Sequence, residues 1–168
     1  MTTLYLVRHG ETIDNARQIM QGQTQGELNE QGVAQARALR DRLKDTAIDT
    51  FVASDLNRAI QTAHILAAPR GKEVVTTPLL RERDWGDFTG EYIPSLADRE
   101  WPANVESLER MLSRAQNFLT WLRVTYPDQT VLAVGHGIIN KAIQSVYYQK
   151  PMSQVPRMDN AEVRILIL

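Results

Sequence analysis

The sequence predicts an α/β fold, a three-layer α/β/α sandwich in which helices flank a mostly parallel central sheet. Short apolar runs that are typical of buried strands alternate along the chain with longer segments of helical apolar spacing. The length of 168 residues is that of one ordinary domain, and the chain contains neither an internal repeat nor a linker. We therefore expect a single domain over residues 1–168.

The individual elements follow from local composition and spacing. The strand segments are rich in aliphatic and β-branched residues, whereas the helical segments repeat apolar residues at intervals of three and four. Residues 79–104 show no periodicity and are expected to form a loop. Side chains able to cap a helix precede three of the expected helices: Asn29, Ser54 with Asp55, and Asn104. The strands are expected at 4–7, 48–53, 74–77, 131–134 and 163–168, and the helices at 29–43, 55–66, 105–122 and 138–148.

Composition and charge exclude several classes of protein. Lys and Arg total 19 and Asp and Glu total 20, giving a net charge of −1, so no basic face for nucleic acid or a membrane surface is expected. No apolar segment approaches the roughly 20 residues that span a bilayer, and the first apolar run is too short for a signal peptide. The absence of cysteine excludes disulfides, thiolate nucleophiles and cysteine-ligated metals. We expect a cytoplasmic protein with no nucleic-acid or membrane partner.

Charged and histidine side chains follow the ends of the expected strands. The first strand is followed by Arg8 and His9, and the second leads to Arg58 on the first turn of the next helix. Glu82 follows the third strand, and His136 follows the fourth. Because ligands of open parallel sheets bind beyond the carboxyl ends of the strands, these side chains are expected to meet at one edge.

These residue types suit the transfer of a phosphoryl group. An arginine guanidinium stays charged and can bind two phosphate oxygens at once. A histidine beside two arginines has its pKa lowered, which keeps the imidazole neutral and nucleophilic near neutral pH. A glutamate that faces a phosphate dianion favours the protonated form that a general acid needs. The residues therefore supply a nucleophile, a charge clamp and an acid.

Five blocks of the sequence resemble the histidine phosphatase superfamily, and more narrowly its phosphoglycerate-mutase-like phosphatase branch. The blocks occur in the family's order, and the resemblance runs from Thr3 to about Leu168. They read RHGET at 8–12, QG at 21–22, SDLNRAIQTA at 54–63, LRE at 80–82 and GHG at 135–137. The sequence departs from the family's pattern at Asp14, Gln25 and Glu27, which leaves the identity of the substrate open. The sequence also leaves the oligomeric state open.

The resemblance implies a role for each candidate site residue. His9 is the residue that is phosphorylated in a covalent intermediate, and Glu82 protonates the leaving group. The phosphoryl oxygens are held by Arg8, Arg58 and His136. The positions that bind phosphate or substrate are Arg8, Asn15, Gln21, Gly22, Arg58, Glu82, His136 and Gly137. No metal ligand and no cofactor are expected, because the arginines supply the positive charge that a metal ion supplies elsewhere.

Three functions are compatible with these residues. The first is a phosphomonoesterase that acts on a small phosphorylated metabolite through His9. The second is a phosphoglycerate mutase, which the short segment 92–104 disfavours because a mutase needs a lid over its phosphohistidine. The third is a phosphate-binding or interaction module without turnover, since one fold can host several functions.

Alternative interpretations also exist for single residues. Arg58 could instead pair with Asp55 or Thr62 on the helix surface. The GHG block resembles the start of a dinucleotide fingerprint, but Asn140 stands where its third glycine would be. His64 lies in the middle of a helix and is expected to be structural. Three other carboxylates share the loop of Glu82 and compete with it as the acid: Asp84, Asp87 and Glu91.

Overall fold

A five-stranded sheet forms the middle layer of the protein, described here from a computed structural model of residues 1–168. The strands are β1 (Thr3–Arg8), β2 (Thr50–Ser54), β3 (Val74–Thr77), β4 (Thr130–Gly135) and β5 (Val163–Ile167). Their order across the sheet is β3-β2-β4-β1-β5, and only β5 runs antiparallel to its neighbour, β1. All the expected strands are present, and the sheet is mostly parallel, as predicted.

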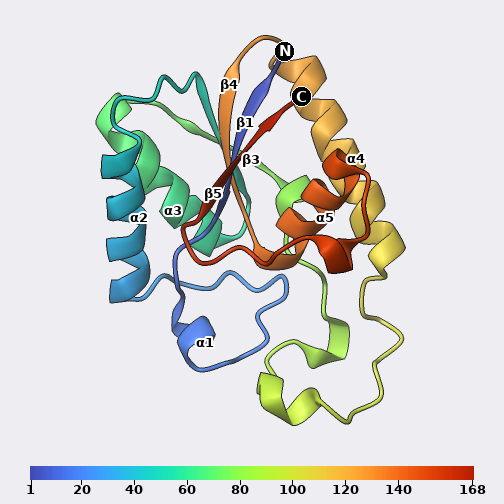
Figure 1. Ribbon diagram of the computed structural model, residues 1–168. Coiled ribbons are helices and arrows are strands. Elements are labelled where there is room, and N and C mark those ends of the chain that lie inside the picture. The colour runs from blue at the N-terminus through green and yellow to red at the C-terminus, as the bar shows by residue number, and fades with distance from the viewer.

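Helices cover both faces of this sheet (Figure 1). The helices are α1 (Ile13–Ala16), α2 (Glu30–Arg42), α3 (Asn57–Ala67), α4 (Leu108–Thr125) and α5 (Gly137–Tyr148). The pair α2 and α3 packs on one face, at the left in Figure 1, and the pair α4 and α5 packs on the other. This arrangement confirms the predicted α/β/α sandwich. None of the helices combines the length and the apolar composition needed to cross a membrane.

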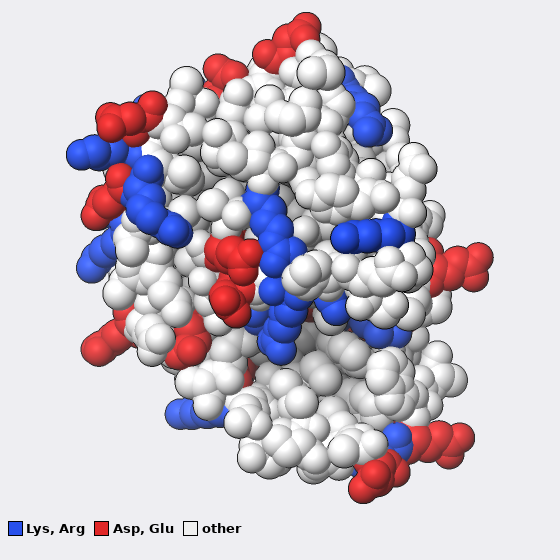
Figure 2. Space-filling view, in the orientation of Figure 1, with Lys and Arg blue, Asp and Glu red and all other residues white.

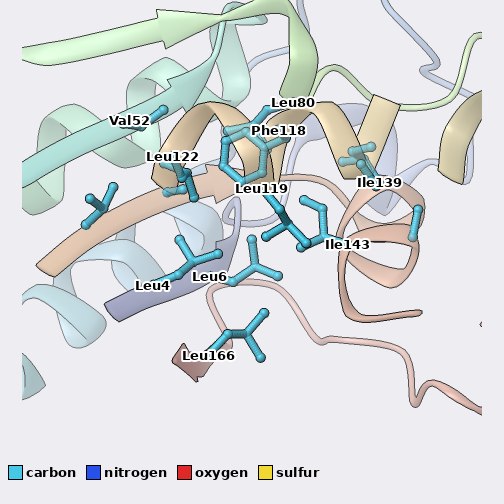
Figure 3. Packing of buried hydrophobic residues seen from close by; sticks show 14 of the residues in the cluster. Leu4, Leu6, Val52, Leu80, Phe118, Leu119, Leu122, Ile139, Ile143 and Leu166 are labelled. Atoms are coloured by element: carbon cyan, nitrogen blue, oxygen red, sulfur yellow. The ribbon is translucent and has the colours of Figure 1, made fainter. Parts of the chain in front are cut away.

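Alternate residues of the strands face the two helix layers, which gives the protein two hydrophobic clusters. On the α4/α5 side, Leu4 and Leu6 of β1 pack in one cluster with Phe118 and Ile143 (Figure 3). On the other side, Phe51 of β2 packs in the cluster formed with α2 and α3. Full burial of each such large side chain contributes about 1.5–3 kcal/mol. The carboxyl ends of the strands are therefore held by packing on both sides.

The start of α3 differs from the prediction that Ser54 or Asp55 caps it. The N-cap residue is Leu56, whose own N–H donates to Ser54 Oγ, and no side chain of the cap residue serves the helix. The side chain of Gln25 accepts the N–H of Asn57 instead, at 3.0 Å. The prediction was wrong because a loop distant in the sequence supplies the acceptor.

The start of α4 also differs from the prediction, which placed the cap at Asn104. The helix begins at Leu108, and Ser107 Oγ accepts the N–H of Arg110 at 3.1 Å. Asn104 lies further upstream, where its Oδ1 accepts the N–H of Asp87 at 3.0 Å. The side chain predicted to cap the helix therefore stabilises the preceding loop.

The segment between β3 and α4 contains no long element, as predicted. It consists of loop and three short 3-10 turns at Pro78–Leu80, Gly86–Phe88 and Ile93–Leu96. In Figure 1 most of this green to yellow segment and α1 lie beyond the lower edge of the sheet, where β1 and β4 end. The segment therefore borders the edge at which ligands of such sheets bind.

The strands β1 and β4 form the point at which the direction of the connections reverses. They are neighbours in the sheet, yet α2, the next long helix after β1, and α5, which follows β4, lie on opposite faces. In parallel α/β sheets such a switch point leaves a crevice between the diverging chains. The register pairs Arg8 with Gly135, so His9 and His136 leave the two strands side by side.

Candidate active site

A cavity of about 380 Å³ opens at the carboxyl edge of the sheet. All but one of the residues predicted for the site line this cavity: Arg8, His9, Asn15, Gln21, Gly22, Arg58, Glu82 and Gly137. The remaining residue, His136, is fully buried beside His9, with the two ring centroids 5.0 Å apart. The structure thus brings together side chains from β1, α1, α3 and α5 with those of two loops. His64 lies elsewhere, on the exposed side of α3.

The imidazole of His9 is held in its neutral form with one ring nitrogen free. Its Nδ1 lies 2.7 Å from the carbonyl oxygen of Gly10. A carbonyl can only accept, so Nδ1 carries the proton and Nε2 keeps its lone pair. Burial, followed by the positive charge of Arg58, lowers the pKa of His9 to about 3. The ring is therefore uncharged at neutral pH, as we predicted from the two arginines expected beside it.

Contacts from three other segments fix the backbone around His9. Asn160 Nδ2 donates to the His9 carbonyl at 3.1 Å, and the Gly10 N–H donates to Thr62 Oγ1 at 3.1 Å. Gly10 also approaches the first turn of α2, where a Cβ on Gly10 would lie 2.5 Å from the Gly32 oxygen. A side chain at position 10 would therefore force the residues that follow β1 away from α2.

Two buried arginines flank His9 without any carboxylate partner. Arg8 and Arg58 are 7% and 1% exposed, and neither forms an ion pair. Arg8 Nη1 donates to the Met158 carbonyl at 2.8 Å, and Arg58 Nη2 donates to the Gly22 carbonyl at 2.7 Å. The Nε atoms of both arginines have no partner. Because a buried cation without a counter-ion costs several kcal/mol, this arrangement favours an anionic ligand.

The alternative partners of Arg58 are engaged elsewhere. Asp55 receives two hydrogen bonds from Arg81, at 2.8 and 2.6 Å. The Thr62 hydroxyl donates to the backbone carbonyl of Arg58 and does not contact its guanidinium. Burial lowers the pKa of Arg58 to about 10, which still leaves the side chain charged at neutral pH.

The carboxylate of Glu82 lies at the start of α5. Its two oxygens accept hydrogen bonds at 2.9–3.0 Å from three backbone N–H groups, those of Arg83, Ile138 and Ile139. The contacts with Ile138 and Ile139 use donors that α5 leaves free at its N-terminus. None of the three competing carboxylates, Asp84, Asp87 and Glu91, lines the cavity, whereas Glu82 does.

Gly137 separates Glu82 from Arg8 at the rim of the cavity. A Cβ at this position would lie 3.6 Å from Arg8 Nε and 3.8 Å from Glu82 Oε2. Any side chain larger than alanine would therefore project between the Glu82 carboxylate and the Arg8 guanidinium. The absence of a side chain keeps that space open to a ligand.

His136 supplies a second imidazole beneath the first. Its Nε2 lies 2.9 Å from Ser54 Oγ, and its Nδ1 has no partner although it is buried. Burial, and then the charge of Arg58, lowers the pKa of His136 well below its usual value. The unpartnered Nδ1 is thus the ring atom left for a ligand.

The amides of Asn15 and Gln21 are positioned by the short helix α1. Thr12 Oγ1 accepts the Asn15 N–H while Asn15 Oδ1 accepts the Thr12 N–H, which forms a capping box. Gln21 Oε1 accepts the Thr12 hydroxyl at 3.0 Å. The amide oxygens are used within the protein, which leaves the N–H groups to face the cavity as donors.

Arg114 of α4 holds the loop that carries Glu82, a role that the sequence analysis missed. Its Nη1 donates to the carbonyls of Leu79 and Arg81, and its Nη2 contacts the Glu82 carbonyl at 3.4 Å. Its guanidinium also forms a largely buried, bidentate pair with Glu106, at 2.9 and 3.2 Å. The sequence did contain a signal for this role, because Arg114 lies on the same side of the helix as the buried apolar residues Met111 and Phe118.

Other residues that line the cavity were not assigned to the site from the sequence, although the aromatic residues of the loop, Trp85 among them, were considered as possible pocket wall. The apolar wall of the cavity consists of Ile19, Met20, Trp85, Ile93 and Ile138. Two further cations, Lys141 and Arg157, complete the lining. The protein contains no group of three or more His, Asp or Glu side chains arranged to hold a metal ion. The sequence signal for Lys141 was its position four residues after Gly137 on the same helix.

Comparison with known proteins gives consistent matches over the whole chain. The family model described as the histidine phosphatase superfamily (branch 1) matches residues 4–168. The "Uncharacterized phosphatase PhoE" of Bacillus subtilis (strain 168) is 36% identical over 166 residues, which is 96% of this chain and 86% of that protein. The "Probable phosphoglycerate mutase GpmB" of Enterobacter sp. (strain 638) is 35% identical over 152 residues, which is 82% of this chain and 71% of that protein.

Solved structures match equally well. A mycobacterial glucosyl-3-phosphoglycerate phosphatase in complex with VO3 has a TM-score of 0.89 at 29% identity, covering 98% of this chain and 92% of that one. The structure of Bacillus stearothermophilus YhfR also has a TM-score of 0.89, at 30% identity, covering 98% and 90% of the two chains.

Proposed function

Since the chain belongs to the histidine phosphatase superfamily (branch 1), we propose that it hydrolyses a small phosphorylated metabolite through a phosphohistidine formed on His9. The family and its phosphatase-named relatives support phosphatase activity. The covalent intermediate, the acid and independence from metal ions are further parts of the proposal. They are supported by the arrangement of the cavity residues.

The observation that carries the proposal is the surroundings of His9 Nε2. A neutral imidazole with a free lone pair lies between Arg8 and Arg58, two buried cations with unpartnered Nε atoms. A phosphate dianion matches both requirements, because its oxygens accept from the guanidinium groups while its phosphorus meets the nucleophile. The unpartnered Nδ1 of His136 supplies a further contact to an oxygen of the phosphoryl group.

The proposed reaction has two steps. In the first, His9 Nε2 attacks the phosphorus, the ester P–O bond breaks, and Glu82, protonated while it faces the bound dianion, gives its proton to the departing alkoxide. In the second, Glu82 takes a proton from a water molecule as that water attacks the phosphorus and the P–N bond breaks. The products are an alcohol and inorganic phosphate, and His9 and Glu82 return to their starting forms. The two arginines stabilise the charge of the transferring group in both steps.

A phosphoglycerate mutase is the second candidate, because one of the similar proteins carries that name. A mutase must shield the phosphohistidine from water while its intermediate reorients. The segment after Glu82 contains no long element that could serve as such a lid, and its 3-10 turn Ile93–Leu96 reaches the cavity through Ile93 alone. Supply of 3-phosphoglycerate with a trace of 2,3-bisphosphoglycerate separates the candidates. Isomerisation much faster than phosphate release would favour the mutase.

The activity itself is tested with 4-nitrophenyl phosphate. We expect inorganic phosphate to be released by the unmodified protein and by His64→Ala, a change on the exposed side of α3. We expect no release by His9→Ala, because the nucleophile is missing. Binding of phosphate without any release by the unmodified protein would instead identify a binding module.

A further inference from the structure

Two cations of the cavity have no part in the proposed chemistry. Lys141 of α5 and Arg157 of the loop before β5 line the cavity together with Arg8 and Glu82. Neither side chain forms an ion pair or a hydrogen bond within the protein. By contrast, the arginines that support nearby loops pair with carboxylates, as Arg114 does with Glu106 and Arg164 with Glu162. Lys141 is half-buried and Arg157 is exposed, so both charges are accessible to a ligand in the cavity.

The position of Lys141 places it beyond the phosphate-binding end of the cavity. It lies four residues after Gly137 on α5, and both residues face the cavity. Four residues of helix span about 6 Å along the axis. Since Gly137 borders Arg8 and Glu82, Lys141 is one helical turn away from the groups that hold the phosphoryl group.

The position of Arg157 is close enough to Arg8 for the two charges to repel. Burial lowers the pKa of Arg8, and the charge of Arg157 lowers it further. The charges of Glu82, Asp159 and Glu162 act in the opposite sense. None of these carboxylates forms an ion pair with Arg157. The fold therefore holds two like charges beside one cavity, an arrangement that an anionic ligand stabilises.

The face that contains the cavity shows the same concentration of positive charge. In Figure 2, Lys and Arg side chains gather around a hollow in the lower middle of the view. The apolar residues Ile19, Met20 and Ile138 also line the cavity and can contact the hydrocarbon part of a ligand. A volume of about 380 Å³ is at the lower end of the usual range for ligand pockets, so the ligand is small.

We propose that Lys141 and Arg157 form a subsite for a second anionic group of the substrate. The substrate of this site is then a phosphomonoester of a small molecule that carries another negative group, either a carboxylate or a second phosphate. This inference rests on the proposed phosphatase function. It adds a substrate class that the catalytic residues alone do not define.

Three probes that differ only in the second group test the subsite. They are 3-phosphoglycerate, which carries a carboxylate, glycerol 1-phosphate, which carries a neutral hydroxymethyl group in its place, and glycerol 1,3-bisphosphate, in which that hydroxymethyl group is phosphorylated. We expect kcat/KM to be at least tenfold higher for one or both of the doubly anionic probes than for glycerol 1-phosphate. Which probe is preferred distinguishes a carboxylate from a phosphate as the second group. Binding of the same probes to His9→Ala, measured by calorimetry, gives a readout that does not depend on turnover.

Matched variants assign the preference to the two cations. Lys141→Gln and Arg157→Gln should each lower the preference for the doubly anionic probe by about tenfold, mainly through KM, because a charge-assisted hydrogen bond is lost. The control variants are Arg37→Gln, on the exposed side of α2, and Lys44→Gln, just after α2. Each removes one positive charge, as Lys141→Gln and Arg157→Gln do, and each should leave the preference unchanged.

The outcomes separate this inference from the proposed function. Equal kcat/KM for all three probes, or equal losses for all probes in Lys141→Gln and Arg157→Gln, would overturn the subsite while phosphate release continues to support a phosphatase. Release of phosphate from 4-nitrophenyl phosphate but from none of the three probes would contradict the subsite alone, whereas no release from any of the four compounds would contradict both proposals. Loss of the preference in Lys44→Gln or Arg37→Gln as well would assign it to overall charge and refute the subsite.

Discussion

Acidification should destabilise the fold through His9, because the folded protein holds this imidazole in its neutral form. The pKa of His9 is lowered from 6.5 to about 3 by burial and by Arg58. Between these two pH values the unfolded chain binds a proton that the folded protein excludes. Stability is therefore independent of this group above pH 6.5 and decreases as the pH falls from 6.5 to about 3.

The size of this loss of stability follows from the shift in the pKa of His9. Each pH unit within that window corresponds to about 1.4 kcal/mol for one group, so the full shift amounts to about 5 kcal/mol. Between pH 6.5 and 4.5, His9 alone should lower the free energy of unfolding by about 2 kcal/mol. His136, whose pKa is also lowered, adds to the slope in the same direction.

Urea unfolding at several pH values between 7.5 and 4.5 measures this contribution. The buffers must contain no phosphate, because an anion bound between Arg8 and Arg58 would stabilise the folded state. His9→Gln should remove about one proton from the pH dependence, whereas His64→Gln, on the exposed side of α3, should retain the unmodified slope. Equal slopes for His9→Gln and the unmodified protein would refute the reasoning. So would an NMR titration in which His9 titrates near pH 6.5.

Three further predictions concern Glu82 as the acid, activity without a metal ion, and the ion pair between Arg114 and Glu106. Glu82→Gln should reduce phosphate release from alkyl phosphates far more than from 4-nitrophenyl phosphate, since a nitrophenolate leaves without a proton; equal losses measured on both would point to another acid. Treatment with EDTA should leave kcat/KM for 4-nitrophenyl phosphate unchanged, because Arg8 and Arg58 supply the positive charge; complete loss that one divalent ion restores would contradict this. Arg114→Met should cost about 3–5 kcal/mol in urea unfolding, because it leaves Glu106 buried and unpaired. The double variant Arg114→Met/Glu106→Gln should recover part of that loss, and a double variant as unstable as the single one would argue against the ion pair as the cause.

The elements of the fold were predictable because their signals are local. The apolar run of β1 and the helical spacing of α4 each depend on residues a few positions apart, and both elements occur close to their predicted bounds. The convergence of His9 and His136 was predictable too, since parallel strands bring their carboxyl ends to one edge. The short α1 was missed because its four residues are too few to show a period.

Features that depend on distant partners could not be predicted in this way. The acceptor at the start of α3 comes from Gln25, which is 32 positions from Asn57 in the sequence. The support of Glu82 comes from Arg114, also 32 positions away. No local pattern encodes such pairs, so sequence reasoning assigned the cap to neighbouring side chains and gave Arg114 no role.

The candidate site could be predicted from the sequence only in part. Residue type and position after a strand identified Arg8 and Glu82, but the state of each side chain depends on the assembled cavity. That Arg8 lacks a carboxylate partner while Arg81 has Asp55 is visible only in three dimensions. Lys141 and Arg157 were missed for the same reason, because their significance comes from facing the cavity without a partner.

The central claim, a covalent intermediate on His9, is tested most directly by trapping the phosphoenzyme. The protein is mixed with a 32P-labelled phosphomonoester that it hydrolyses, quenched in base within the first turnover, digested and mapped by mass spectrometry. We predict an acid-labile, base-stable phosphoryl group on His9 that appears before inorganic phosphate and is then converted to it. A label on His136, or phosphate release through a full turnover without any labelled histidine, would contradict the account.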